Sequence, residues 1–208
     1  MIRSIRARRA RGDRGAVLVE AAFVLPVLLT IVFGIIEFGF AWRDKITVET
    51  ATRAGARTAS NLGPTAQADY NTLQTVISAM SSIPSANIDL VIIFDATTSG
   101  TPSATCLAGT SVTNNNAAGA GNGTGCNVYT SSQFSLASSS FGINCSTGPD
   151  HFWCPTGSAR QNSLSQTGGP AYVGVYVKAH RSFITKIFGT TGPTMTSTSV
   201  LRLEPPSS

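Results

Sequence analysis

An uncharged apolar run near the N-terminus constrains the fold more than any other feature of the sequence. Residues 21–36 contain no charged side chain, and Glu20 and Glu37 stand at the two ends of this run. On an α-helix, which rises about 1.5 Å per residue, the two carboxylates lie roughly 25 Å apart, close to the hydrocarbon thickness of a bilayer. We therefore interpret residues 16–42 as a transmembrane helix in contact with the lipid bilayer.

The position of the basic residues indicates how this helix is oriented. The 208-residue chain has a formal net charge of +5, and residues 1–15 hold six arginines and one aspartate, so this leader carries all five charges. Positive charge before a span favours a cytoplasmic N-terminus, although four basic residues also follow the run up to Arg57. We expect a single-pass protein of the cytoplasmic (inner) membrane, with residues 1–15 inside and the C-terminal domain outside. The neutral body argues against a nucleic-acid partner.

All four cysteines lie in a polar stretch downstream of the apolar run. An even number of cysteines in an exported region indicates two disulfides, and three connectivities are possible. We favour Cys106 with Cys126 and Cys145 with Cys154, because this pairing closes the shortest loops. His151 lies near the second pair, but the spacing fits no standard zinc pattern, and we expect no metal.

A candidate processing site precedes the apolar run. A secretory signal peptide has a small-residue cleavage site after its apolar region, and no such site follows this one. Gly15 has no side chain, so a protease can approach its backbone closely. Cleavage after Gly15 would free an α-amine at Ala16, which shares a helix face with Glu20 and could pair with that carboxylate or with one on a packed neighbour. Glu20 lies at the bilayer edge and is a functional candidate. The alternative is a carboxylate that only extends to the lipid headgroups. For Glu37 we favour this alternative.

Gly15 followed by four apolar residues and then Glu20 resembles the processing site of type IV prepilins. The longer run from Gly15 to Pro26 is similar to the TadE-like family of tight-adherence pili, and the sequences at 37–39 and 51–57 (ATRAGAR) fit the same family. The resemblance covers residues 12–60, with a looser likeness at the C-terminal strands. It implies a pseudopilin of a tight-adherence (Flp-type) pilus or secretion system, acting in pilus biogenesis or adhesion. A prepilin peptidase would cut between Gly15 and Ala16, and other pseudopilins or pilus assembly components would be partners.

Three further residues of the span are typical of membrane helices. Pro26 removes a helix hydrogen bond and predicts a kink. Gly34 and Gly39 permit close approach of another helix. All three are equally expected of any single-pass anchor, so they identify no partner.

The rest of the chain predicts an extracytoplasmic α+β domain over residues 64–208, joined to the span by a neck helix over 43–63. We expect about two helices and a three-stranded antiparallel sheet, a pilin-like layout. The Ser/Thr/Asn/Gly-rich segment 96–169 carries the cysteines and predicts a long insertion, which by resemblance would be the display surface. Periodicity predicts an amphipathic helix over 65–80 and strands over 171–178 and 195–203. A short, bounded apolar run predicts a strand over 88–94, and we also expect a short helix over 182–188.

No catalytic motif stands out. The only two histidines, His151 and His180, lie beside no plausible nucleophile motif, and neither G-x-S-x-G nor H-E-x-x-H occurs. We therefore expect no enzymatic activity and no cofactor. Two alternatives to the pseudopilin remain open. One is an uncleaved single-pass anchor that displays a disulfide-stapled binding domain, and the other is an exported hydrolase, which would need a metal at His151 or a nucleophile that no motif reveals.

Overall fold

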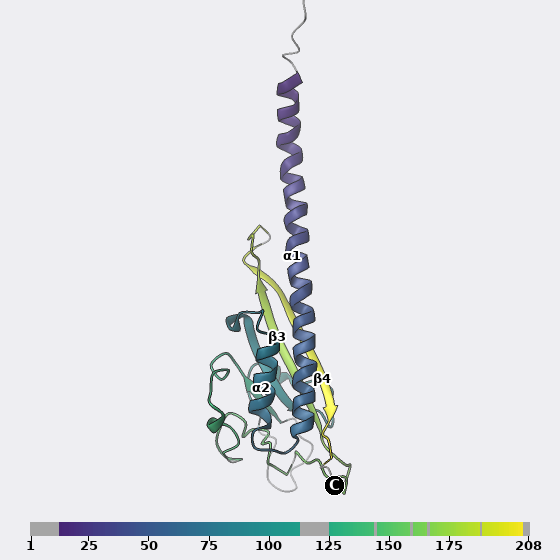
Figure 1. Ribbon diagram of the computed structural model, residues 1–208, viewed down its shortest axis with the longest axis vertical. Helices are drawn as coiled ribbons and strands as arrows, with labels where there is room; N and C mark the ends of the chain where they lie inside the picture. The colour runs from purple at the N-terminus through teal and green to yellow at the C-terminus, as the bar shows by residue number, and fades with distance from the viewer. Residues whose placement is uncertain are drawn as a thin grey trace, which may run out of the picture.

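One long helix carries a small α+β body at its C-terminal half (Figure 1). The computed structural model describes residues 13–112, 125–143, 145–158, 160–165, 167–187 and 189–205. The elements in chain order are α1 (Asp13–Leu62), α2 (Ala68–Ala79), η1 (Ser85–Asn87), β1 (Ile88–Asp95), α3 (Ala104–Leu107), β2 (Cys126–Tyr129), η2 (Ser138–Ser140), β3 (Tyr172–Ser182) and β4 (Thr191–Arg202). The two η elements are single 3-10 turns.

The predicted span and the predicted neck form one continuous helix, α1, of 50 residues. Pro26 lies inside it, and the helix continues on both sides of this residue. The helix ends at Leu62. Gly63 follows it with a φ of +52°, a conformation that favours glycine, and its N–H donates to the Ala59 carbonyl. The N-terminal half of α1 projects beyond the body (Figure 1), and we call its apolar residues 16–36 the stem. The C-terminal half of α1 packs against α2, β3 and β4.

The sheet has four strands rather than the three expected, in the order β2-β1-β3-β4, and every neighbouring pair is antiparallel. The additional strand is β2, which lies inside the polar insertion and pairs with β1 from Val91–Tyr129 to Phe94–Cys126. The pairing of the last two strands was predicted, but both are longer than expected.

The short helix expected over residues 182–188 is wrong for the residues described there. β3 continues to Ser182, which pairs with Thr191 at the start of β4, so the segment is the connection of a β-hairpin. Lys186 has a φ of +57° and Gly189 a φ of +110°, backbone conformations that are incompatible with a right-handed helix.

Two apolar clusters cover the two faces of the sheet. On one face α1 and α2 supply residues such as Val48 and Val76, which pack with Val91 and Ile93 of β1. On the other face Leu90, Ile92 and Phe94 pack with the cysteines of α3 and β2. Because residues 90–94 of β1 are buried on both faces, this part of the strand is a continuous apolar run rather than an alternating one.

Candidate functional site

The predicted processing residues lie in the exposed first turns of α1. Gly15, Ala16 and Glu20 are all exposed, and a Cβ added at Gly15 would meet nothing within 4 Å. Since α1 begins at Asp13, Gly15 lies in the first helical turn, where backbone N–H groups have no acceptor within the helix and the turn frays readily. A protease therefore has steric access to this peptide bond. The arginines at positions 3–11 of the predicted leader lie outside the described residues.

The stem that follows is apolar and uncovered. The most apolar 18-residue window of α1 has a mean hydropathy of 2.5, and none of it is buried against the protein. By length and composition, α1 is the one described helix able to cross a membrane. Its exposed apolar side chains include Val17, Leu18, Phe23, Leu28, Ile31 and Ile35. So large an apolar surface is unfavourable in water and indicates a contact with lipid or with other apolar helices.

Glu37 lies at the C-terminal end of the apolar run, where we expected its carboxylate to extend freely to the headgroups. The structure differs from this expectation. The Glu37 side chain is covered by protein, with only 3% of the residue exposed. Oε1 accepts hydrogen bonds from the backbone N of Thr185 at 2.8 Å and from its Oγ1 at 3.1 Å. Glu37 thus joins α1 to the tip of the β3–β4 hairpin.

The two glycines of the span are in different surroundings. Gly34 is partly buried and, with Glu37, lines an apolar hollow beneath the hairpin. Gly39 faces open space, since an added Cβ would meet nothing within 4 Å. In the described structure, therefore, only Gly34 lies beside another element.

On the C-terminal side of Glu37 along α1, polar contacts join this helix to strands β3 and β4. Arg181 of β3 forms an ion pair with Asp44, and its guanidinium lies 4.8 Å from the ring centroid of Phe40. Lys45 donates to the Thr196 carbonyl of β4 at 2.6 Å. These contacts fix the direction in which the hairpin runs along α1.

The cysteines form the two predicted disulfides, Cys106–Cys126 and Cys145–Cys154. His151 Nδ1 lies at 2.5 Å from the Gly148 carbonyl oxygen. Among the described residues, no three His, Cys, Asp or Glu side chains come together as a metal site. His180, the second histidine, bonds Asp89 through Nδ1 at 2.6 Å.

A buried polar network that the sequence analysis missed fixes the insertion to α2. The Asp69 carboxylate accepts hydrogen bonds from Asn127 and Tyr129, both at 2.7 Å, and from Arg160 at 2.5 Å. Asn127 also bonds the backbone of Trp153 through both ends of its amide, with its Nδ2 at 3.0 Å from the carbonyl and its Oδ1 at 2.8 Å from the N–H. Burial, and then the Asp69 carboxylate, raises the pKa of Tyr129 well above its ordinary value, so the phenol stays protonated and donates.

A second buried carboxylate, Asp150, lies near this network. Its Oδ2 accepts from the Gly142 N–H at 2.8 Å, whereas its Oδ1 has no hydrogen-bond partner within the described part of the chain. Burial first, and the charge of Asp69 second, raise the pKa of Asp150 to about 6. The network and Asp150 together hold the chain between β2 and β3 in a defined conformation, which is a structural role.

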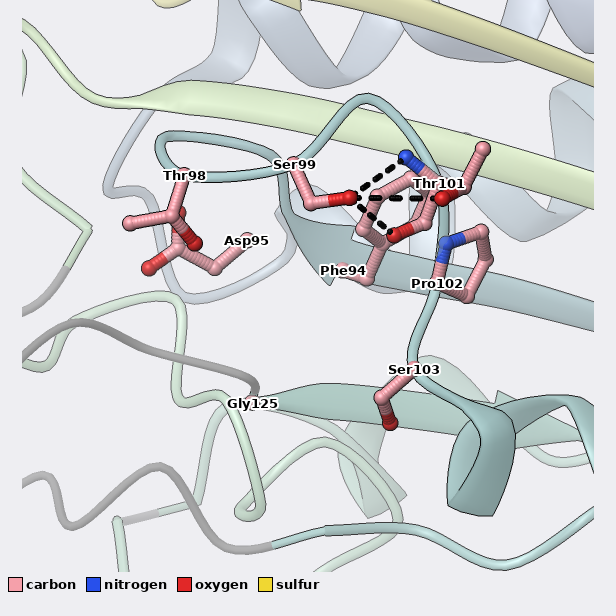
Figure 2. Close-up of a pocket in the computed structure, with 8 residues that line it drawn as sticks. All are labelled: Phe94, Asp95, Thr98, Ser99, Thr101, Pro102, Ser103 and Gly125. Atoms are coloured by element: carbon pink, nitrogen blue, oxygen red, sulfur yellow. Dashed lines mark hydrogen bonds between the residues drawn. The ribbon is translucent and has the colours of Figure 1, made fainter.

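One small hollow lies at the end of β1 (Figure 2). It has a volume of about 100 Å³ and is lined by Phe94, Asp95, Thr98, Ser99, Thr101, Pro102, Ser103 and Gly125. Its polar groups bond one another: Ser99 Oγ contacts the N and Oγ1 of Thr101 at 3.2 and 3.3 Å, as the dashed lines in Figure 2 show. Burial raises the pKa of Asp95, whose carboxylate accepts from the Thr97 N–H at 2.9 Å. The Ser103 hydroxyl, at the other side of the hollow, caps α3 by accepting from the Cys106 N–H at 3.3 Å.

The long helix and the body together define a class of protein in which an α+β domain is carried on one partly exposed apolar helix. Residues 15–57 match the family model described as TadE-like protein, which confirms the resemblance over that stretch. The match covers the stem and the first part of α1 that packs on the body. No curated protein and no solved structure matches the chain.

Proposed function

We propose that the protein is a TadE-like pseudopilin of a tight-adherence (Flp-type) pilus assembly or secretion system, processed by a prepilin peptidase after Gly15. One observation carries the proposal: the exposed apolar stem begins directly after Gly15, and the TadE-like match begins at the same residue. Because the stem has no cover within the described protein, it can lie in lipid before assembly and against other apolar stems afterwards.

Glu20 is the residue of the stem with which the N-terminus freed by cleavage would pair. It is exposed one helical turn after Ala16, so the α-amine freed by cleavage at Ala16 can reach the Glu20 carboxylate of the same or a neighbouring stem. Neutralising a carboxylate at the bilayer edge favours close packing of such helices. The partners are then the prepilin peptidase, the bilayer, and other pseudopilins or pilus assembly components.

The proposed topology places residues 1–15 in the cytoplasm and the body outside, in the periplasm or at the cell surface. The arginines of the leader support a cytoplasmic N-terminus. The two disulfides support an oxidising compartment for the body. The role is structural rather than catalytic, in line with the polar network, in which the Asp69 carboxylate accepts from Asn127, Tyr129 and Arg160.

The N-terminal sequence and intact mass of the protein from the membrane fraction test the proposal, in cells with and without a prepilin peptidase. We expect a start at Ala16, retention of the leader without the peptidase, and retention in Gly15→Arg. Gly12→Arg is the matched control, because it adds the same side chain in place of a glycine three residues upstream, and it should still be processed.

A start at Met1 in the presence of active peptidase would contradict the pseudopilin. The protein would then be an uncleaved single-pass anchor that displays its disulfide-stapled domain. The observation that favours this second function is the insertion itself, which both disulfides and the buried Asp69 network hold in place.

A further inference from the structure

The β3–β4 hairpin extends past the rest of the body along α1, toward the stem (Figure 1). Its tip, residues 183–187, lies beside Glu37, the residue that ends the uncharged run of α1. Hydrogen bonds from Thr185 to Glu37 and the Arg181–Asp44 ion pair hold it there. The depth of the tip relative to the stem is therefore fixed by the protein.

The tip presents apolar side chains to its surroundings. Ile184 is 58% exposed and Ile187 is 52% exposed. Lys186 lies between them with its side chain exposed and its backbone in the left-handed region. Two exposed isoleucines flanking one lysine are poorly suited to water but well suited to the boundary between acyl chains and headgroups, where a lysine stem lies in apolar surroundings and its ammonium reaches the phosphates.

The side chains of α1 at the same level have the composition of a membrane interface. Phe38 and Trp42 are both exposed and stack on one another, with ring centroids 6.3 Å apart. Aromatic side chains of this kind gather at the headgroup level of membrane proteins. Between α1 and the tip lies an open, mainly apolar hollow of about 520 Å³, lined by Gly34, Glu37, Phe38, Ala41, Phe183 and Pro193.

We propose that the tip of the β3–β4 hairpin inserts into the outer interface of the bilayer beside α1, as a second membrane contact that holds the body against the membrane. This inference rests on the proposed function, because it requires the stem to lie in the bilayer. The hollow between the tip and α1 would then be filled by lipid acyl chain.

Lipid is favoured over a second copy of the chain as the occupant for two reasons. Among the described residues of the tip, the large apolar side chains that are exposed are Ile184 and Ile187, far less than the surface that a stable protein–protein interface buries. The tip also lies at the same level along α1 as Glu37, where the apolar run ends. A bilayer that covers the stem therefore reaches the tip without any further rearrangement.

Spin labels on single introduced cysteines, in the full chain reconstituted into vesicles of zwitterionic and anionic phospholipid, test the proposal. The native cysteines are bonded in disulfides and do not react with the label. Ile187→Cys reports on the tip, Leu28→Cys on the stem, and Leu164→Cys on an exposed site of the body. Accessibility to oxygen and to a water-soluble paramagnetic reagent gives the depth of each label.

We expect the label at position 28 to lie in the hydrocarbon, the label at 164 in water, and the label at 187 at the interface, with a loss of accessibility to the aqueous reagent. If the label at 28 is in lipid while that at 187 is as accessible as that at 164, the hairpin does not touch the membrane although the anchor stands. If the label at 28 is in water, the anchor itself fails. Dipolar broadening at 187 that disappears on dilution with unlabelled protein would assign the tip to a second copy and overturn the proposal.

Discussion

Asp69 of α2 and Arg160, which lies 91 positions later in the chain, form an ion pair that is buried on both sides. Arg160 Nη1 lies 2.5 Å from Asp69 Oδ1, and the two side chains are 2% and 1% exposed. The guanidinium also lies 3.8 Å from the ring centroid of Trp153. The pair therefore joins the helix layer to the chain around the Cys145–Cys154 disulfide, and the conformation of the insertion depends on it.

Removing one partner of this pair should destabilise the body strongly. Asp69→Ala leaves the Arg160 charge buried without its counter-ion and deprives Asn127 and Tyr129 of their acceptor, so we expect a loss of about 3–5 kcal/mol. Urea unfolding of the full chain in detergent, followed by tryptophan fluorescence, measures it. Asp89→Ala is the control, because Asp89 bonds the half-exposed His180 and should cost less than about 1 kcal/mol. Equal losses in the two variants would contradict the role of the network.

The buried Asp150 should make stability fall as pH rises. Its pKa is raised from 3.8 to about 6 in the folded protein, mainly by burial. Between these values the folded state binds more protons than the unfolded state, so the free energy of unfolding decreases as pH rises from about 4 to 6. One pKa unit corresponds to about 1.4 kcal/mol, so the decrease is at most about 3 kcal/mol.

Asp150→Asn removes this titration, and the comparison separates it from the carboxylates that lie away from Asp150. We expect the curve of unfolding free energy against pH to be flatter in the variant over this window, as measured by urea unfolding at several pH values. Parallel curves for the two proteins would show that the Asp150 carboxyl titrates alike in the folded and unfolded chains.

Much of the scaffold could be predicted from local patterns. The apolar run between Glu20 and Glu37 predicted the stem, alternation predicted β3 and β4, and the shortest loops gave the disulfides. The strand β2 could not be predicted, because its four residues lie in a polar segment and become a strand only by pairing with the distant β1. The short helix expected at 182–188 is wrong because the backbone at Lys186 is left-handed.

One feature of the sequence could have indicated the buried polar network. Asp69, Leu73 and Val76 occupy positions i, i+4 and i+7, so the Asp69 carboxylate lies on the apolar face of α2. A carboxylate in such surroundings requires a partner. The identity of that partner could not be predicted, since Arg160 is brought to it by tertiary structure alone. The same holds for Glu37 and Thr185, which are 148 positions apart.

Gly55 permits the close packing of α1 on α2. A Cβ at this position would lie 2.4 Å from Cγ2 of Val76, too close for any real contact. We expect Gly55→Ala to lower the free energy of unfolding by about 1–3 kcal/mol through overpacking, although alanine is the better helix former by about 1 kcal/mol. Val76→Ala in the same chain removes the clashing methyl, so the double variant should lose less than the sum of the two single variants in urea unfolding. A Gly55→Ala protein more stable than wild type would show that Val76 moves aside freely.

The contact between Glu37 and the hairpin tip should govern the exchange of the Thr185 amide. Thr185 lies beyond the paired residues of β3 and β4, and its N–H donates to the Glu37 carboxylate at 2.8 Å. A hydrogen bond to a charged group contributes about 1.5–3 kcal/mol, so Glu37→Ala should speed exchange of this amide roughly tenfold or more. Hydrogen exchange of the full chain in detergent, read by mass spectrometry over the tip peptide, measures it. Glu49→Ala is the matched control, because Glu49 is a half-exposed residue of the same helix that pairs only with Lys45 among the described residues, and it should leave the tip unchanged. Equal exchange in wild type and Glu37→Ala would show that the strands, rather than α1, hold the tip in place.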